Sequence, residues 1–450
     1  MGDTADTISL IWEKKSHTNF SNKSIRQIIE DLNNDNINIE KYIINFLDSN
    51  ELNERWAFIK LLLGGYRIGV SANFIKNTLA IFGNKKKDEI ENIWNGLKPP
   101  YLNLIRWLKN EADYPQVNIS ETFHSMMLAN SINLEKDQAK INPKDYSAEY
   151  KWDGIRVQIS SKNGETRIFS RSGDDISFSF PEITLDSKKL IVLDGELLAG
   201  INFKPFSFSK LQKRLNKKKP SKNLINSFPV FIRLYDILFF NDIDLRNKNL
   251  IERKKVLNKF FSKINSNNFF DLSTSIEFTD FKMLNNIYLG CTKSKFIEGL
   301  MLKKNTSHYI AGRKKDFWLK WKRTPKLIDG ILMYAQRGHG KRSSYYSDFT
   351  LGVYNKDKVI VPIAKAYSGF TDKELQKLDK FVRENTIKKY GPVREVKKIL
   401  VVELAFDSMQ ESNRHKSGVS LRFPRFHRIR WDKPSQETTS LDQLIAEFMN

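Results

Sequence analysis

Cysteine is almost absent from this chain: Cys291 is the only one among its 450 residues. A single thiol excludes both a disulfide framework within the chain and a zinc site built from several cysteines. Long apolar runs are also missing, since no stretch approaches the roughly 18 consecutive apolar residues that a membrane-spanning helix needs. The N-terminus has no apolar segment behind a basic start, as a secretion signal would have. We therefore expect a soluble cytoplasmic protein with no membrane partner.

Acidic residues are scarce relative to basic ones: 52 Asp and Glu stand against 75 Lys and Arg, which gives a formal charge of +23. Such an excess favours a polyanionic partner, nucleic acid first, because basic side chains neutralise phosphates and release their counterions. The chain is also rich in Asn, Ile, Lys and Phe, so A+T-rich coding bias is a competing explanation. With 40% hydrophobic residues, the chain has ample apolar material for sizeable cores.

The chain is too long for one compact domain, and three regions with different residue patterns follow one another along it. Residues 1–118 have apolar side chains at helix-like spacings, for example Ile25, Ile28 and Ile29. Residues 119–323 change to short β-branched runs separated by turns, which is typical of a mixed α/β unit.

The third region covers residues 324–450, where about five strand-like segments with one inserted charged helix suit a small barrel. We expect strands at 328–334, 350–354, 359–363 and about 399–404, and the helix at 372–386. The sequence thus predicts a multidomain α+β protein.

A lysine just before an Asp-Gly turn is the first candidate for covalent chemistry. Lys151 precedes Asp153 and Gly154 in a segment flanked by apolar residues. Burial beside other cations lowers the pKa of a lysine and makes its amine a nucleophile. An ordinary surface turn is the alternative that this segment alone leaves open.

Two carboxylates stand beside later apolar runs. Glu196 ends an apolar run after an Asp-Gly pair, and Glu298 with Gly299 begins another. Two carboxylates that face one pocket can hold Mg²⁺, which prefers oxygen ligands and accompanies phosphates. A pair of solvated turn glutamates is the alternative.

Two lysines alternate with apolar residues in the strand-like segment that begins at Trp318. The period of a strand sends Lys320 and Lys322 to the same face. Two aligned ammonium groups suit an α-phosphate and the charge that develops on it. An edge strand protected by lysines would give the same pattern.

The segments around Lys151, Glu196, Glu298 and Lys320, in this order, resemble the nucleotidyltransferase motifs of ATP-dependent DNA ligases. The chain also has the family's Ser-Arg-Ser-Gly element at Arg171 and an aromatic-Asp segment, and its end resembles the family's last motif. The resemblance extends from about residue 61 to the C-terminus. The segments at 335–340, 365–369 and 414–418 resemble the bacterial three-domain branch of the family.

The resemblance implies a division into three domains that together encircle nicked duplex DNA as a monomer. They are a helical DNA-binding domain at residues 1–118, an ATP-grasp-like α/β nucleotidyltransferase domain at 119–323 and an OB-fold β-barrel at 324–450. The helical domain is shorter than expected for such ligases, so the chain is either naturally trimmed or lacks an N-terminal portion. Arg67, beside three glycines, is the candidate DNA contact of this domain, with a simple turn between helices as the alternative.

The resemblance also assigns roles to individual side chains. Lys151 forms the covalent bond to AMP, Glu149 recognises the adenine, and Tyr235 stacks on it where the family usually has Phe. The other expected contacts are Arg156 and Arg171 with the ribose or phosphates, Lys314, Lys320 and Lys322 with the nucleotide, Glu196 and Glu298 with the metal or sugar, and Arg430, Asp432 and Lys433 with ATP when the barrel closes.

The implied function is an ATP-dependent DNA ligase that uses ATP as the AMP donor, with Mg²⁺ or Mn²⁺, and seals nicks in repair, replication or recombination. A bacterial cytoplasmic, nucleoid-associated location goes with it. An RNA ligase or an mRNA capping enzyme would share the segments from Lys151 to Lys322, and an inactive DNA-binding protein is a further alternative. An NAD-dependent ligase is disfavoured, because its four-cysteine zinc module cannot be built from one cysteine.

Overall fold

The computed structural model describes most of the chain. The described ranges are residues 4–13, 15, 23–34, 36–63, 70–97, 99–117, 122–132, 137, 141–215, 217–264, 269–292, 294–338, 342–413 and 415–449. The chain divides into two compact units, Met1–Ile75 and Lys76–Asn450. Each has its own hydrophobic clusters and is considered by itself.

Short helices make up the described part of the first unit. They are α1 (Thr4–Ile11), α2 (Ile25–Leu32), α3 (Ile39–Ser49) and α4 (Leu52–Leu63). The apolar spacing predicted helices here, and α2 and α3 confirm that prediction. In the core, the rings of Phe46 and Phe58 stack with 4.0 Å between their centroids. Tertiary burial of this kind stabilises helices that are too short to be stable alone.

Helices continue into the second unit. They are α5 (Ala72–Gly83), whose first residues belong to the first unit, α6 (Lys87–Ile93) and α7 (Leu102–Leu108). Gly83 permits a close approach between α5 and α7, because a Cβ atom there would lie 2.5 Å from Cδ2 of Leu108. Buried side chains that include Ile90 and Trp107 fill the space between the three helices.

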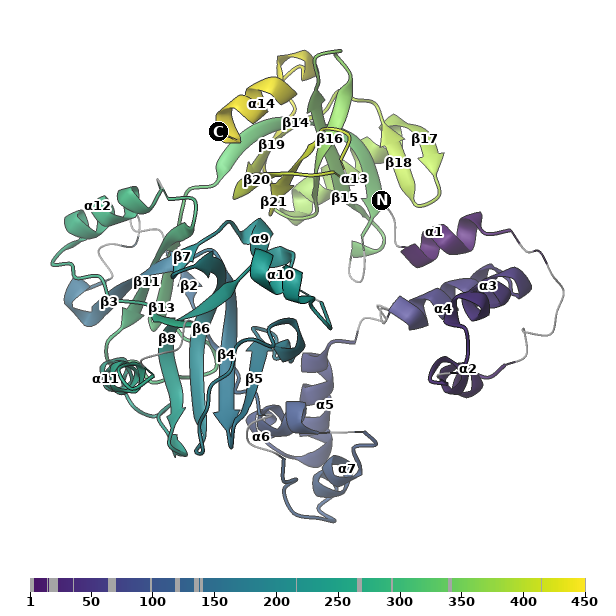
Figure 1. Cartoon of the computed structure of the whole chain (residues 1–450). Coiled ribbons are helices and arrows are strands. Elements are labelled where there is room, and N and C mark those ends of the chain that lie inside the picture. The colour runs from purple at the N-terminus through teal and green to yellow at the C-terminus, as the bar shows by residue number, and fades with distance from the viewer. Residues whose placement is uncertain are drawn as a thin grey trace. The chain divides into compact units, whose positions relative to one another are not determined.

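Two sheets form the centre of the second unit (Figure 1). The four-stranded sheet has the order β2-β13-β11-β3. Its strands are β2 (Asn130–Ser131), β3 (Tyr146–Trp152), β11 (Ile297–Lys304) and β13 (Trp318–Lys322).

The seven-stranded sheet runs in the order β10-β8-β6-β4-β5, with β7 and β9 paired to β6 and β8. Its strands are β4 (Ile155–Lys162), β5 (Glu165–Ser170), β6 (Ile191–Ile201), β7 (Lys204–Pro205), β8 (Val230–Phe240), β9 (Ile243–Asp244) and β10 (Phe270–Leu272). Two further short strands, β1 (Met127–Leu128) and β12 (Gly312–Arg313), pair with each other in parallel and with neither of these sheets.

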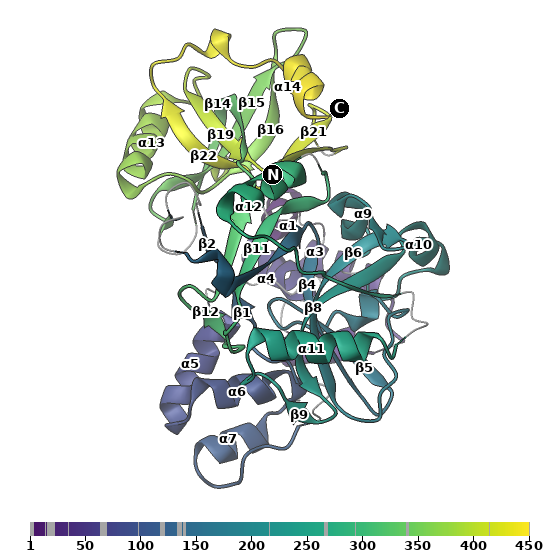
Figure 2. The ribbon, with the colours of Figure 1, turned by 90° about the vertical axis from the view of Figure 1, so that its left-hand side faces the viewer.

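Helices pack against these sheets. They are α9 (Phe208–Gln212), α11 (Leu250–Phe261) and α12 (Phe281–Thr292). The short helix α10 (Lys222–Ser227) lies in the chain between α9 and β8. Figure 2 shows α11 lying across the strands of the larger sheet, and Leu257 and Phe260 bury their side chains in the core beneath it. The mixed α/β character predicted for residues 119–323 is therefore confirmed.

The C-terminal part of the unit is rich in strands. These are β14 (Lys326–Arg337), β15 (Tyr346–Tyr354), β16 (Ile360–Ala366), β17 (Thr386–Tyr390), β18 (Val393–Val396), β19 (Val401–Phe406), β20 (Ser408–Glu411), β21 (Val419–Arg422) and β22 (Arg425–Arg430). The helices α13 (Asp372–Asn385) and α14 (Leu441–Phe448) accompany them. The predicted strands and the charged helix are present, and β17, β18, β20 to β22 and α14 are additional.

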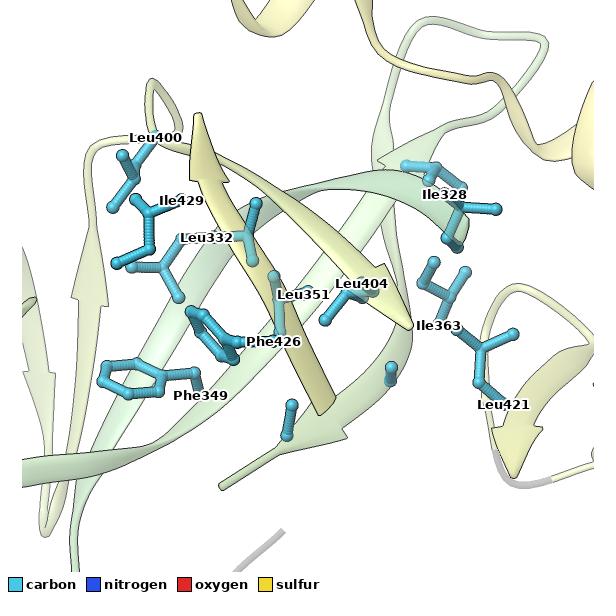
Figure 3. Packing of buried hydrophobic residues seen from close by; sticks show 14 of the residues in the cluster. Ile328, Leu332, Phe349, Leu351, Ile363, Leu400, Leu404, Leu421, Phe426 and Ile429 are labelled. Carbon is cyan, nitrogen blue, oxygen red and sulfur yellow. The ribbon is translucent and has the colours of Figure 1, made fainter. Parts of the chain in front are cut away.

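The strand β14 organises this region. One edge pairs with β15, and the other pairs first with β19 and then with β18. Figure 3 shows Leu332, Leu351 and Phe426 gathered in the apolar core that these strands enclose. The pairing of β14 along both edges and the single inserted helix agree with a small barrel. The OB-fold assignment and the domain boundaries at 118 and 323 stay predictions. Across the described residues, every helix is too short or too polar to span a bilayer.

Candidate active site

One face of the four-stranded sheet carries four of the predicted site residues, Glu149, Lys151, Lys320 and Lys322. Met301 on β11 pairs with Glu149 on β3 and with Lys320 on β13, and Gly299 pairs likewise with Lys151 and Lys322. Directly paired residues share a face of a sheet. This face, which lines a cavity of about 400 Å³, presents Glu149, Lys151, Met301, Lys303, Trp318, Lys320 and Lys322. The prediction that Lys320 and Lys322 point the same way is confirmed.

A bulge brings Glu298 into the same cavity. The pairing of β11 with β3 shifts between Ile297 and Gly299, so Glu298 is the extra residue on its strand. Bulges re-aim a side chain that a regular strand would send to the other face. Gly299 has φ of +140°, and a Cβ atom there would lie 2.0 Å from the carbonyl oxygen of Trp321. Only glycine fits this backbone without displacement.

Lys151 and Glu298 form an ion pair within the cavity. The Nζ atom of Lys151 donates a hydrogen bond to Oε2 of Glu298. Burial lowers the pKa of Lys151, but the negative charges of Glu298 and Glu196 outweigh burial, and the pKa is raised. The expected lowering of this pKa is therefore wrong, because the sequence could not show how close the carboxylates lie. Burial disfavours ionisation of Glu298, but Lys151 and Lys322 lower its pKa to about 2.

Glu196 reaches the cavity from the larger sheet. It lies on β6 opposite Arg156 on β4. Burial raises the pKa of Glu196 to about 7, with Lys151 opposing and Glu298 supporting the rise. The described residues contain no group of three or more His, Cys, Asp or Glu side chains that could hold a metal ion by itself. Two carboxylates fit Mg²⁺ that takes its other oxygen ligands from phosphate and water.

The predicted arginines occupy different environments. Arg156 lines the cavity, yet its guanidinium donates to both carboxylate oxygens of Asp194 at 3.0 and 2.6 Å and to the Met127 carbonyl at 2.5 Å. A ribose or phosphate bound to Arg156, as predicted, would therefore contact a guanidinium that is already hydrogen-bonded to Asp194. Arg171 is exposed and lines the cavity.

Tyr235 and Trp318 form an aromatic wall of the cavity. Their ring centroids lie 6.2 Å apart in an edge-to-face arrangement, and Nζ of Lys303 lies 4.3 Å from the Tyr235 ring. Trp318 and Lys303 were not predicted as site residues. Strand alternation contained the signal, because Trp318 has the same parity as Lys320 and Lys322.

Several predicted contacts lie elsewhere. Lys314 is exposed and does not line the cavity. Arg430 pairs with Asp432 at 3.0 Å and Lys433 with Asp329 at 2.7 Å, and these motif residues do not line the cavity either. Arg67 lies outside the described residues.

The C-terminal region instead supplies Arg422 and Phe423 to the cavity. Nη1 of Arg422 lies 2.6 Å from Oδ2 of Asp153, the residue that follows Lys151 by two positions. The guanidinium carbon lies 3.9 Å from the centroid of the Phe208 ring, which lines the same cavity. This contact was not predicted from the sequence.

The fold and the site define a protein that handles a phosphorylated ligand with an aromatic base, since lysines and paired carboxylates stand beside an aromatic wall. Family models identify it further: residues 126–322 match the ATP dependent DNA ligase domain, and residues 342–433 match the ATP dependent DNA ligase C terminal region. Together the two matches cover more than half of the 450 residues. The chain belongs to the family of ATP-dependent DNA ligases.

Known proteins with similar sequences carry corresponding names. A probable DNA ligase of Koribacter versatilis is 35% identical over 317 residues, which cover 66% of this chain and 55% of that protein. DNA ligase 1 of Korarchaeum cryptofilum is 27% identical, and the match covers 87% of this chain and 71% of that protein. The chain thus spans between about half and seven tenths of these two relatives. A solved structure described as Pmar-Lig_Pre shares the fold, with a TM-score of 0.53 and 18% identity over 95% of this chain and 92% of that one.

Proposed function

We propose that this chain seals nicks in duplex DNA as an ATP-dependent ligase, with Lys151 carrying AMP between ATP and DNA. The observation that carries the proposal is the placement of Lys151 in one cavity with three carboxylates, three further lysines and an aromatic wall. Membership of the ligase family and the names of the relatives support ATP and DNA as the substrates.

The proposed chemistry consists of three in-line displacements at phosphorus. Nζ of Lys151 attacks the α-phosphate of ATP, and the bond to pyrophosphate breaks. The 5′-phosphate of the nick then attacks the phosphorus of the bound AMP, and the Lys151 nitrogen leaves. Finally, the 3′-hydroxyl attacks the 5′-phosphate, and AMP leaves. Such reactions depend on positioning and charge neutralisation. Lys320 and Lys322, which line the cavity, would supply them.

The first step requires a neutral amine. In the structure Lys151 is held as an ammonium by Glu298 and Glu196, so it must lose a proton before it attacks. Glu298 and Glu196 are the residues that would hold Mg²⁺, which neutralises phosphate charge when bound. The same carboxylates therefore govern both the charge of Lys151 and the fit of the metal.

The flanking regions complete the proposal. The helical N-terminal region would bind DNA, and the C-terminal strands would form an OB-fold that packs on the duplex. One chain would then encircle the nick. The excess of basic residues supports this arrangement through contacts with phosphates. The enzyme would serve repair, replication or recombination in the nucleoid.

A nick-sealing assay tests this function. A duplex with a labelled 5′-phosphate at a nick is incubated with the full chain, ATP and Mg²⁺, and the label should move into a longer strand on a denaturing gel. GTP or NAD⁺ in place of ATP should give little product. A chain that seals RNA nicks but not DNA nicks would overturn the proposal in favour of an RNA ligase.

A further inference from the structure

Two lysines converge on Glu149 at the wall of the cavity. Nζ of Lys254 lies 2.6 Å, and Nζ of Lys303 lies 3.0 Å, from Oε1 of Glu149. The side chains of Glu149 and Lys303 are each 2% exposed, and that of Lys254 is 15% exposed. Ser273 adds a hydrogen bond to the same carboxylate. Removing three charges from water costs free energy, and truncating one partner would leave the others uncompensated.

The two lysines face different surroundings. Lys303 lines the cavity together with Glu149, and its Nζ atom lies 4.3 and 4.7 Å from the ring centroids of Tyr235 and Trp318. Lys254 does not line the cavity and contacts Glu149 from the side of α11. Lys303 is therefore in a position to touch a ligand, whereas Lys254 acts on a ligand only through Glu149.

The position of Lys254 is fixed by its neighbour in α11. Arg253 and Asp236 on β8 form a fully buried ion pair, with two hydrogen bonds of 2.8 and 2.9 Å. Arg253 also donates to the carbonyl oxygens of Lys248 and Ser307 at 2.7 and 3.0 Å. These contacts anchor the first turns of α11 to the sheet, so Lys254 approaches Glu149 from a defined direction.

Holding Glu149 as a carboxylate has a consequence for base recognition. An ionised carboxylate only accepts hydrogen bonds. Adenine offers an amino donor at the position where guanine carries a carbonyl oxygen. A fixed carboxylate in the cavity therefore attracts the first base and repels the second. Burial opposes ionisation of Glu149, but Lys254 and Lys303 outweigh burial and lower its pKa.

We propose that Lys254 is a positioning residue that orients Glu149 toward the base, and that it thereby sets the preference for adenine over guanine nucleotides. Lys303 contacts the same oxygen, Oε1, from the cavity side, so it does not replace the contact that Lys254 makes from α11. The inference rests on the proposed function, since it assigns the cavity to ATP. It adds a determinant on α11, outside the sheet face that carries the nucleophile.

Nucleotide binding tests this role without requiring catalysis. Calorimetry on the full chain measures the affinities for ATP and GTP, with Lys254→Met, Lys254→Arg and Lys255→Met compared with the unchanged protein. Lys255 is the matched control, because it is the next residue on α11 and is exposed. Lys254→Met should weaken ATP binding by about tenfold and affect GTP less, since a charge-assisted hydrogen bond to Glu149 is lost.

The other variants separate positioning from general damage. Lys254→Arg, which keeps the charge, should recover most of the ATP preference, and Lys255→Met should bind both nucleotides as the unchanged protein does. If Lys254→Met does not fold, Lys254→Gln takes its place with the same expectation. An unaltered ratio of ATP to GTP affinity in the folded variant would overturn the inference. Failure of the unchanged protein to seal nicks, with the predicted shift in affinities intact, would overturn the proposed function alone.

Discussion

At the scale of single residues, the decisive feature is the ion pair between Lys151 and Glu298. It keeps the candidate nucleophile protonated, because the nearby negative charges outweigh the effect of burial on its pKa. A charged lysine on a strand end is stable and correctly placed, but unreactive. The ion pair therefore keeps Lys151 protonated and unreactive until a charged ligand enters the cavity.

This charge state predicts a pH dependence for AMP loading. The neutral amine is the reactive form, and below a raised pKa its fraction grows about tenfold for each pH unit. The single-turnover rate of self-adenylylation should thus rise steadily from about pH 6 to about pH 9. Glu298→Gln removes the largest of the charges that raise the pKa of Lys151, so its slower reaction should begin to level off at a lower pH. A rate that is flat across this range in the unchanged protein would contradict the account.

At this scale the sequence predicted which kinds of residue line the cavity, but not which side chains contact one another. The sequence indicated a cavity with Lys151, Glu196, Glu298 and two lysines, and the structure brings these together. It did not indicate Lys254, whose segment has the pattern of an ordinary amphipathic helix with solvated charges. Contacts across long separations, such as that of Lys254 with Glu149, leave no periodic signal in one sequence.

At the scale of elements, the bulge in β11 decides where Glu298 points. A regular strand would place Glu298 on the face opposite Met301, away from the cavity. The extra residue and the positive φ of Gly299 reverse this outcome. Strand periodicity predicted β11 and β13 correctly, but it could not predict a bulge, since an Asp-Gly or Glu-Gly pair equally suits a turn.

The bulge predicts a cost for any side chain at Gly299. Gly299→Ala should lower the free energy of unfolding by about 1–3 kcal/mol, because a methyl group would meet the Trp321 carbonyl and the φ is unfavourable. Self-adenylylation should fall with it as Glu298 is displaced. Gly290→Ala on α12, where a Cβ atom meets nothing within 4 Å, is the control and should leave stability equal or slightly higher. Urea unfolding measures both, and equal curves for the two variants would refute the strain argument.

At the scale of the whole molecule, the positive charge has two explanations that salt can separate. A protein that contacts six to ten phosphates loses affinity for DNA by a factor of roughly 10³ to 10⁵ when salt rises from 50 to 200 mM. Binding of nicked duplex by the full chain, followed by fluorescence anisotropy, should show this slope. Affinity that hardly changes with salt would assign the charge of +23 to coding bias.

The last motif predicts a movement of the C-terminal region. Lys433 pairs with Asp329 and does not line the cavity, so contact with ATP requires that this pair break. Lys433→Ala should therefore slow AMP loading while sparing sealing of nicks that already carry AMP. Lys373→Ala, at an exposed position of α13, is the control. Equal losses in both assays would show that Lys433 acts chiefly in DNA binding.

The central claim is that Lys151 carries AMP, and mass spectrometry of the adenylylated peptide tests it most directly. The full chain is incubated with ATP and Mg²⁺, digested, and searched for a peptide heavier by one adenylyl group. We predict that the modification lies on Lys151, and that Lys151→Ala takes up no AMP while it still seals pre-adenylylated nicks at a measurable rate. AMP on another residue, or continued uptake by Lys151→Ala, would contradict the assignment of the nucleophile.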